Sequence, residues 1–173
     1  GLVSSHSESD MFSCNQAILL KPAAVRIYPT VVIQDTQLEK LFNKNEYTPL
    51  TLEEAVNLAA HMYIKFSEHN IPVIKTGIHP FDLQTVHTII AGPYHPGFGF
   101  LVKSKIRQYE LHNKIESLLQ KNTKSKHLEL ILPVTAIEEY IGHKKENITY
   151  LKKIFKLDSI TYSAGSEFNI KIF

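Results

Sequence analysis

The sequence predicts an α/β fold, in which helices alternate with strands that are apolar along their whole length. Residues 25–33 form one such strand and "IPVIKTGI" (71–78) forms another, with two helices between them. Continuous rather than alternating apolar residues are typical of parallel strands covered by helices. Fewer than three such strands precede residue 80, which is too few to close a barrel, so we expect this region to be the end of a larger α/β fold.

Helix boundaries in the first half follow from capping signals. Thr36 with Glu39 predicts the start of a short helix, and Thr51 with Glu54 predicts the start of the clearest helix in the sequence, which Asn70 ends. The apolar residues expected to be buried by these two helices are Leu38, Leu41 and Phe42 in the first and Leu52, Ala55, Val56, Ala59, Met62, Tyr63 and Phe66 in the second.

The N-terminal segment predicts a strand end and a helix. Gly1-Leu2-Val3 has the character of the end of a strand, and "KPAAV" (21–25) ends the helix that follows. The apolar residues of that helix stand loosely at helical spacing: Phe12, Ala17, Ile18 and Leu20.

The second half predicts a long helix, a basic linker and a separate α/β unit. The helix covers 101–120, with Lys103, Lys105, Arg107 and Lys114 on its solvated face. The unit that follows is expected as strand 128–132, helices 135–142 and 147–157, and strands 159–163 and 168–173. We therefore divide the chain into residues 1–80, a connecting loop and helix (81–125), and a small C-terminal α/β domain (126–173).

Composition excludes several classes of protein. The net charge of +2 is too small to indicate nucleic-acid binding by itself, so any such function depends on a local cluster of charges. Cys14 is the only cysteine, which excludes an internal disulfide and a cysteine-cluster metal site. No apolar run approaches the roughly 20 residues of a membrane span. We expect a cytoplasmic protein with no membrane partner and no metal site of its own.

The stretch "RIYPTVVIQDTQLEKLF" (26–42) carries a family resemblance. A basic residue, Ile-Tyr-Pro-Thr, an aliphatic residue, Val-Ile and a helix-starting Thr are similar to the end of the radical S-adenosylmethionine barrel in the Elongator catalytic-subunit family. The segments "IPVIKTGIHP" (71–80) and "AGPYHPGFGFLV" (91–102) resemble its bacterial branch, which is often labelled oxygen-independent coproporphyrinogen III oxidase-like. The resemblance covers roughly residues 15–105 well.

This resemblance implies that residues 1–80 are the last elements of a partial (β/α) barrel. The missing upstream barrel half would carry the family's Cys-x-x-x-Cys-x-x-Cys motif, which ligates a [4Fe–4S] cluster and is absent from this sequence. S-adenosylmethionine and the cluster are therefore expected in the full-length parent, and neither is expected to bind this chain alone. The substrate class that the resemblance implies is transfer RNA, with the wobble uridine as target. Asp35 and Asn45 depart from the family, in which glycine is commoner at both places.

Four residues are candidates for lining a cofactor or substrate cavity. The resemblance puts Arg26 and Tyr28 on the last barrel strand, beside that cavity. Tyr94 and His95 would project from the turn "AGPYHPGFG" (91–99), where a histidine can carry a proton near neutral pH. The alternatives are structural: Arg26 in a buried ion pair with Tyr28 hydrogen-bonded in the core, and a turn whose glycines supply unusual dihedral angles.

The stretch "IGHKKENITYLKKIF" (141–155) resembles the K-homology RNA-binding module, in which a Gly-x-x-Gly turn between two helices clamps a nucleic-acid backbone. Gly142 matches the first glycine and Lys145 replaces the second. The RNA-binding residues that this resemblance implies are Gly142, His143, Lys144, Lys145, Lys152 and Lys153. A small α/β unit with a solvated lysine turn explains the same residues.

Several functions remain open from the sequence. The chain is the C-terminal part of a radical S-adenosylmethionine enzyme that acts on transfer RNA, a stand-alone RNA-binding module, a coproporphyrinogen oxidase-like protein, or a fragment with a structural role only.

Overall fold

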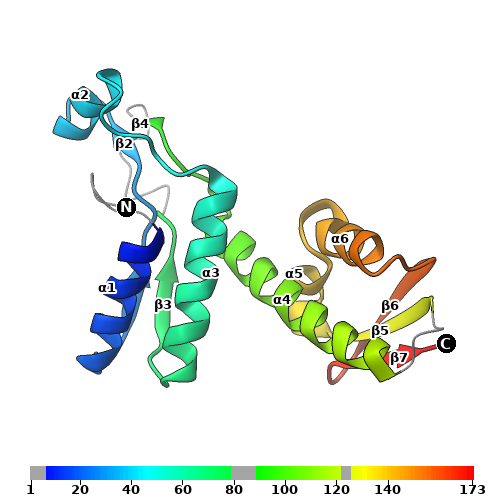
Figure 1. The fold of residues 1–173 in the computed structure, drawn as a ribbon. Helices are drawn as coiled ribbons and strands as arrows, with labels where there is room; N and C mark the ends of the chain where they lie inside the picture. The colour runs from blue at the N-terminus through cyan, green and yellow to red at the C-terminus, as the bar shows by residue number, and fades with distance from the viewer. Residues whose placement is uncertain (1–6, 79–88, 122–125) are drawn as a thin grey trace. The chain divides into compact units, whose positions relative to one another are not determined.

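The structure is a computed structural model that describes residues 7–78, 89–121 and 126–173 (Figure 1). It divides into two compact units within helix α4 (Phe98–Lys121): unit 1 is Gly1–Val102 and unit 2 is Lys103–Phe173. Both units combine helices with small sheets, so the predicted α/β class is confirmed. The expectations for Gly1-Leu2-Val3 and for most of the basic linker lie outside the described residues.

Unit 1 contains two sheets of two strands each in its described part. Strand β1 (Val25–Ile27) pairs in parallel with β3 (Val73–Thr76), as the continuous apolar residues predict. Strand β2 (Val32–Ile33) pairs with β4 (Ile89–Ala91) in the antiparallel direction. Parallel pairing therefore holds for the first sheet and not for the second.

The single strand predicted over residues 25–33 is wrong. The chain leaves the first sheet at Tyr28-Pro29-Thr30 and enters the second at Val32. Pro29 has no backbone N–H and a fixed φ, so it cannot donate to a continuing ladder. The break therefore follows from the proline in the middle of the segment.

Threonine caps begin the two helices of unit 1 that were predicted from them. In α3 (Leu52–Glu68) the Thr51 hydroxyl accepts the Glu54 amide at 3.2 Å, and the Glu54 carboxylate accepts the Thr51 amide at 2.8 Å, which completes the capping box. In α2 (Gln37–Asn43) Thr36 accepts the Glu39 amide, but the Glu39 carboxylate accepts the amide of Asp35. In α2 the carboxylate of the capping box therefore accepts from Asp35, one residue before the cap residue Thr36.

Residues with a left-handed backbone end several of these segments. Asn70 has φ +58° and closes α3 as predicted, while the Ile71 amide donates to the Phe66 carbonyl at 2.9 Å. Asp35 and Asn45 have φ of +59° and +60°. Glycine adopts this conformation without strain, and Asp and Asn tolerate it better than other residues. The two departures from the family's glycines therefore fall where the backbone itself favours glycine.

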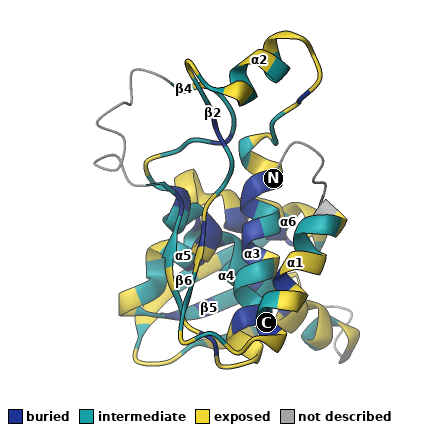
Figure 2. Ribbon diagram, turned by 90° about the vertical axis from the view of Figure 1, so that its left-hand side faces the viewer, coloured by how far each residue is buried: buried dark blue, intermediate teal, exposed yellow. Residues whose placement is uncertain are grey.

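Burial on the helices of unit 1 differs from the prediction in places. Helix α1 (Ser7–Leu19) buries Cys14 and Ile18, whereas Phe12 and Leu20 are exposed. Helix α2 has no buried residue, and its predicted apolar residues are only half-buried (Figure 2). Helix α3 packs against β1 and β3, and its buried residues are Ala55, Val56, Ala59, Ala60 and Phe66.

Unit 2 has a mixed sheet covered by helices. Its elements after α4 are β5 (His127–Pro133), α5 (Ile137–Ile141), α6 (Glu146–Ile154), β6 (Ser159–Gly165) and β7 (Asn169–Ile172). The order is β6-β5-β7, with β5 parallel to β6 and antiparallel to β7. All five elements predicted after residue 126 are present.

The core of unit 2 gathers on one face of β5. Alternate residues Leu128, Leu130 and Leu132 are buried, as expected for a strand with one covered face. They join a cluster with residues of α4, α5, α6 and the following loop: Leu111, Ile115, Tyr140, Ile148, Leu151 and Leu157. This core holds the turn between α5 and α6 in place.

We predict that Gly77→Ala strongly destabilises the protein. Gly77 has φ +82°, and a Cβ there would lie 2.7 Å from the Cβ of Phe98. The left-handed backbone and the steric overlap should together lower the free energy of unfolding by about 2–5 kcal/mol, measured by urea denaturation. Gly99→Ala is the control, because Gly99 lies in α4 and its φ is not positive. Equal urea midpoints for Gly77→Ala and the unmodified protein would contradict this backbone geometry.

Candidate functional site

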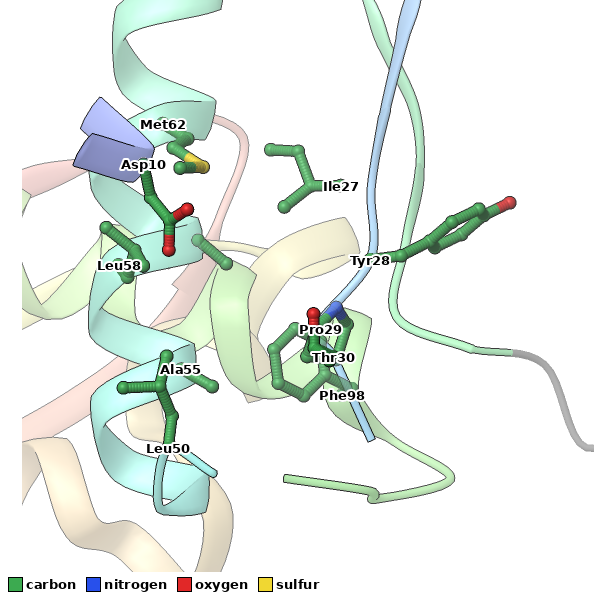
Figure 3. Close-up of a pocket in the computed structure, with 11 residues that line it drawn as sticks. Asp10, Ile27, Tyr28, Pro29, Thr30, Leu50, Ala55, Leu58, Met62 and Phe98 are labelled. Carbon is green, nitrogen blue, oxygen red and sulfur yellow. The ribbon is translucent and has the colours of Figure 1, made fainter. Parts of the chain in front are cut away.

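Arg26 and Tyr28 lie on the face of β1 that α3 does not cover. Ile27 is buried, whereas its two neighbours are exposed. In Figure 3 the side chain of Ile27 extends toward Met62 of α3, and the ring of Tyr28 extends to the opposite side of the strand. The structural alternative, with Arg26 in a buried ion pair and Tyr28 in the core, is therefore wrong for this part of the chain.

Lys75 joins these two residues across the parallel pair. It stands opposite Arg26 in the register of β1 and β3, and its Nζ lies 5.8 Å from the centroid of the Tyr28 ring. An ammonium group over a phenol ring is a cation–π contact. We call Arg26, Tyr28 and Lys75 the open face of unit 1; it presents two cations and a phenol.

A small cavity lies behind β1 (Figure 3). Its volume is about 70 Å³. Sites for ligands of drug size are typically about 300–1,000 Å³, so this cavity is too small to hold S-adenosylmethionine. Tyr28 borders it, but its ring points away. The other lining residues are Asp10, Ile27, Pro29, Thr30, Leu50, Ala55, Leu58, Ala59, Met62 and Phe98.

His95 supports the start of α4. Its Nδ1 accepts the amide of Gly97 at 3.0 Å, and its carbonyl accepts the amide of Phe98 at 3.0 Å. The amide of Tyr94 donates to Gly92, whose φ is +110°. Amides at the start of a helix lack partners within the helix, so an imidazole that accepts one of them has a structural role. This geometry favours the ordered-turn interpretation of the segment.

The turn between α5 and α6 has a backbone that favours glycine at both ends. Gly142 has φ +81°, and a Cβ there would lie 2.8 Å from the Glu146 Cγ. Lys145 has φ +64° and precedes the first residue of α6. The two glycine positions of the K-homology resemblance are therefore both left-handed, although one of them carries a lysine. Lys144 between them is also left-handed, at φ +49°.

A buried amide fixes this turn. Asn147, at 1% exposure, accepts the Gln108 Nε2–H at 3.0 Å. Its own Nδ2–H groups donate to Ser104, to the Glu139 carbonyl and to the Tyr140 carbonyl at 3.0–3.2 Å. Helices α4, α5 and α6 thus meet at a single side chain. Sequence reasoning missed this node, although polar Ser104 and Gln108 stand at helical spacing among the apolar residues of α4.

The cations of this region have no ion-pair partners in the described part of the chain. Lys144, Lys145 and Lys153 are exposed and Lys152 is half-buried, and no described carboxylate lies within ion-pair distance of any of them. Other lysines of unit 2 are paired: Lys103 with Glu139 at 3.6 Å, Lys114 with Glu110 at 3.0 Å and Lys171 with Glu129 at 3.2 Å. The unpaired charge of these lysines is thus available to an external anion.

Arg107 belongs to a network below this turn rather than to the solvated face predicted for it. It is half-buried and bonds Glu110 at 3.0 Å, and its guanidinium lies 4.9 Å from the centroid of the Tyr140 ring. The Tyr140 hydroxyl donates to the same carboxylate at 2.9 Å. Burial and this hydrogen bond raise the pKa of Tyr140 to about 12.

The part of the chain that the structure describes gathers no ligand set for an iron–sulfur cluster. Cys14, its only cysteine, is buried in α1, and burial raises the pKa of its thiol, which disfavours the thiolate that metals bind. Nowhere in residues 7–78, 89–121 and 126–173 do three or more His, Cys, Asp or Glu side chains gather as a metal site would require. No helix in the described ranges is long and apolar enough to span a bilayer.

Comparison with known proteins gives one family. The model of the family described as Radical_SAM C-terminal domain matches residues 22–108, from the residues before β1 into α4. No curated protein and no solved structure matches the chain.

We predict that Asn147→Ala lowers the free energy of unfolding by about 3 kcal/mol or more. The change leaves the buried amide of Gln108 and the carbonyl of Tyr140 without this partner, and each unsatisfied buried group costs about 1–3 kcal/mol. Thr149→Ala on the exposed side of α6 is the control and should change stability much less. Indistinguishable urea midpoints for the two variants would argue against the buried node.

Tyr140 should make stability fall at high pH. Its pKa is raised from 10 in the unfolded chain to about 12 in the folded one, so its contribution is complete below pH 10 and is lost as pH rises toward 12. Tyr140→Phe should be less sensitive to pH than the unmodified protein over this interval, as followed by urea denaturation. Parallel pH profiles for the two proteins would contradict this assignment.

Proposed function

Since the chain belongs to the radical S-adenosylmethionine proteins that carry this C-terminal domain, we propose that it is the C-terminal part of such an enzyme and acts on transfer RNA. The single observation that carries the RNA part is the turn Gly142–Lys145, with its left-handed backbone and unpaired lysines. Membership of the Elongator catalytic-subunit branch, with the wobble uridine as target, is the finer proposal. It rests on the resemblance of "RIYPTVVI" (26–33).

The open face of unit 1 would border the substrate space. In a (β/α) barrel, helices cover the outer face of the strands and alternate residues point to the interior. Arg26 and Tyr28 lie on the face opposite α3, so they would point inward once an upstream barrel half closes the sheet. S-adenosylmethionine and a [4Fe–4S] cluster, which supply radical chemistry in this family, are assigned to that upstream half, because this sequence holds a single, buried cysteine and not the family's three-cysteine motif.

The turn of unit 2 would contact the RNA backbone. Gly142 is buried against Glu146 and Asn147, so it shapes the turn, and the contacts with phosphate would come from the exposed side chains that follow it. His143, Lys144 and Lys145 are exposed and next to one another, and Lys152 and Lys153 follow on α6. Such contacts position the nucleic acid without reading its sequence. The specificity for one nucleotide would then come from the substrate space of the barrel.

A second candidate function is favoured by the two cations of the open face. Arg26 and Lys75 are partners in the register of β1 and β3, so two cationic side chains belong to neighbouring strands. A coproporphyrinogen oxidase-like protein would place carboxylates of its substrate there. A stand-alone RNA-binding module would instead use the turn alone. Loss of RNA binding on changing the turn lysines would disfavour the coproporphyrinogen oxidase-like protein. Loss of modification activity on changing Arg26 would disfavour the stand-alone RNA-binding module.

We predict that replacing Lys144 and Lys145 by Ala weakens transfer-RNA binding by about 1 kcal/mol or more, because charge-assisted contacts with phosphate are lost. The slope of log affinity against log salt should also fall by about 1.5, since two fewer phosphates release counterions. Gel shift at two salt concentrations measures both effects. The fold should survive, because both side chains are exposed.

The matched control removes two paired lysines, Lys103→Ala with Lys171→Ala, which lowers the net charge by the same amount. Its binding should stay closer to that of the unmodified protein. Binding that does not depend on salt, or equal losses in the two double variants, would contradict the proposed interface.

A further inference from the structure

An aromatic row lies beside the lysine turn, on α6 and the facing part of α4. The Tyr150 hydroxyl and His112 Nδ1 are 3.1 Å apart, and their ring centroids are 5.9 Å apart. His112 in turn lies 4.9 Å from Phe155, centroid to centroid. The ring of Tyr150 is therefore held in position by neighbours in unit 2.

This row ends in an exposed apolar surface. Tyr150 is 38% exposed and Ile154, one helical turn further along α6, is 52% exposed. Both belong to the same side of α6, because residues four apart are neighbours on a helix. An aromatic ring that is oriented by hydrogen bonding and still open to solvent is suited to stack with a planar ligand.

The charges around Tyr150 select the class of ligand. Lys153 lies three residues after Tyr150 and on the same side of α6, whereas Lys145 precedes the helix with a left-handed backbone. Glu146, four residues before Tyr150, is the only carboxylate within α6, whereas the turn and the helix together carry four lysines, Lys144, Lys145, Lys152 and Lys153. Because these lysines have no carboxylate partner among the described residues, the segment that carries the ring keeps an excess of positive charge. A ligand with planar rings joined by anionic groups complements this surface.

We propose that Tyr150, supported by His112, is a stacking platform for an unpaired base of the RNA whose phosphates contact the lysine turn. This inference rests on the proposed RNA function and specifies the kind of RNA segment that is bound. In a duplex the bases are stacked on one another and their faces are not available, whereas unpaired bases stack on aromatic side chains. Unit 2 therefore binds an unpaired segment, such as a loop, in preference to a helix.

Three RNA probes test this proposal with the full chain: a single strand, the same sequence as a duplex, and the same strand with abasic sites, which keeps the phosphates and lacks the bases. Tyr150→Ala should weaken binding of the single strand by about 5- to 150-fold, which corresponds to one stacked base. Binding of the duplex and of the abasic strand should change by less than about twofold. Tyr150→Phe keeps the ring and should stay near the unmodified protein.

Stacking on this residue can be measured directly by tryptophan fluorescence, because the chain contains no Trp of its own. Tyr150→Trp would introduce a single indole, whose fluorescence should be quenched by the single strand and unchanged by the abasic strand. This second variant keeps an aromatic ring and tests the proposal even if Tyr150→Ala does not fold. Equal quenching by both strands, or equal loss of affinity for both with Tyr150→Ala, would overturn the stacking platform.

The two proposals fail in different ways. If the turn lysines matter and Tyr150→Ala binds the single strand as tightly as the unmodified protein does, the platform is overturned and the RNA function stands. If the unmodified protein shows no salt-dependent affinity for any of the three RNA probes, the RNA function is overturned and the platform with it.

Discussion

The side-chain amide of Asn147 is the interaction on which the second unit depends. Three helices bring polar groups to it, and at 1% exposure the side chain is shielded from bulk solvent. It binds the carbonyls of Glu139 and Tyr140 in the last turn of α5 as well as that of Ser104 in α4, and the residue itself stands in the first turn of α6. One amide thereby sets where α5 stops, how tightly the chain turns and where α6 starts.

Local signals in the sequence were sufficient for the helices of the first unit. The Thr51 and Glu54 pair and the left-handed Asn70 act over a few residues, so their effect can be predicted without the rest of the fold. Pro29 was a comparable local signal, but the single strand predicted over residues 25–33 did not take its missing N–H into account. The pairing of β5 with β6 in one direction and with β7 in the other could not be predicted, because strand partners are chosen by tertiary packing.

The candidate sites also divide into features that have a local sequence signal and features that depend on tertiary packing. The turn at Gly142 and its lysines was predicted from residue types alone, because the conformational freedom of glycine and the charge of lysine do not depend on distant parts of the chain. Asn147 was missed, since a polar residue in a helix is usually on the solvent side, and its burial depends on α4, distant in sequence. Arg26 and Tyr28 were singled out as site candidates from the sequence, and this assignment stays a prediction; which face of the strand they occupy depended on where α3 packs.

The fixed turn also has a consequence for association. A flexible loop that becomes ordered on binding loses conformational freedom worth about 1–2 kcal/mol per residue, which weakens the complex. Asn147 binds the carbonyls of Glu139 and Tyr140 just before residues 142–145, and within the turn the Lys145 amide donates to the Gly142 carbonyl at 3.1 Å. The backbone of this turn is therefore pre-organised, and only the lysine side chains lose entropy when an anion arrives. Contacts with only a few phosphates can then give a measurable affinity.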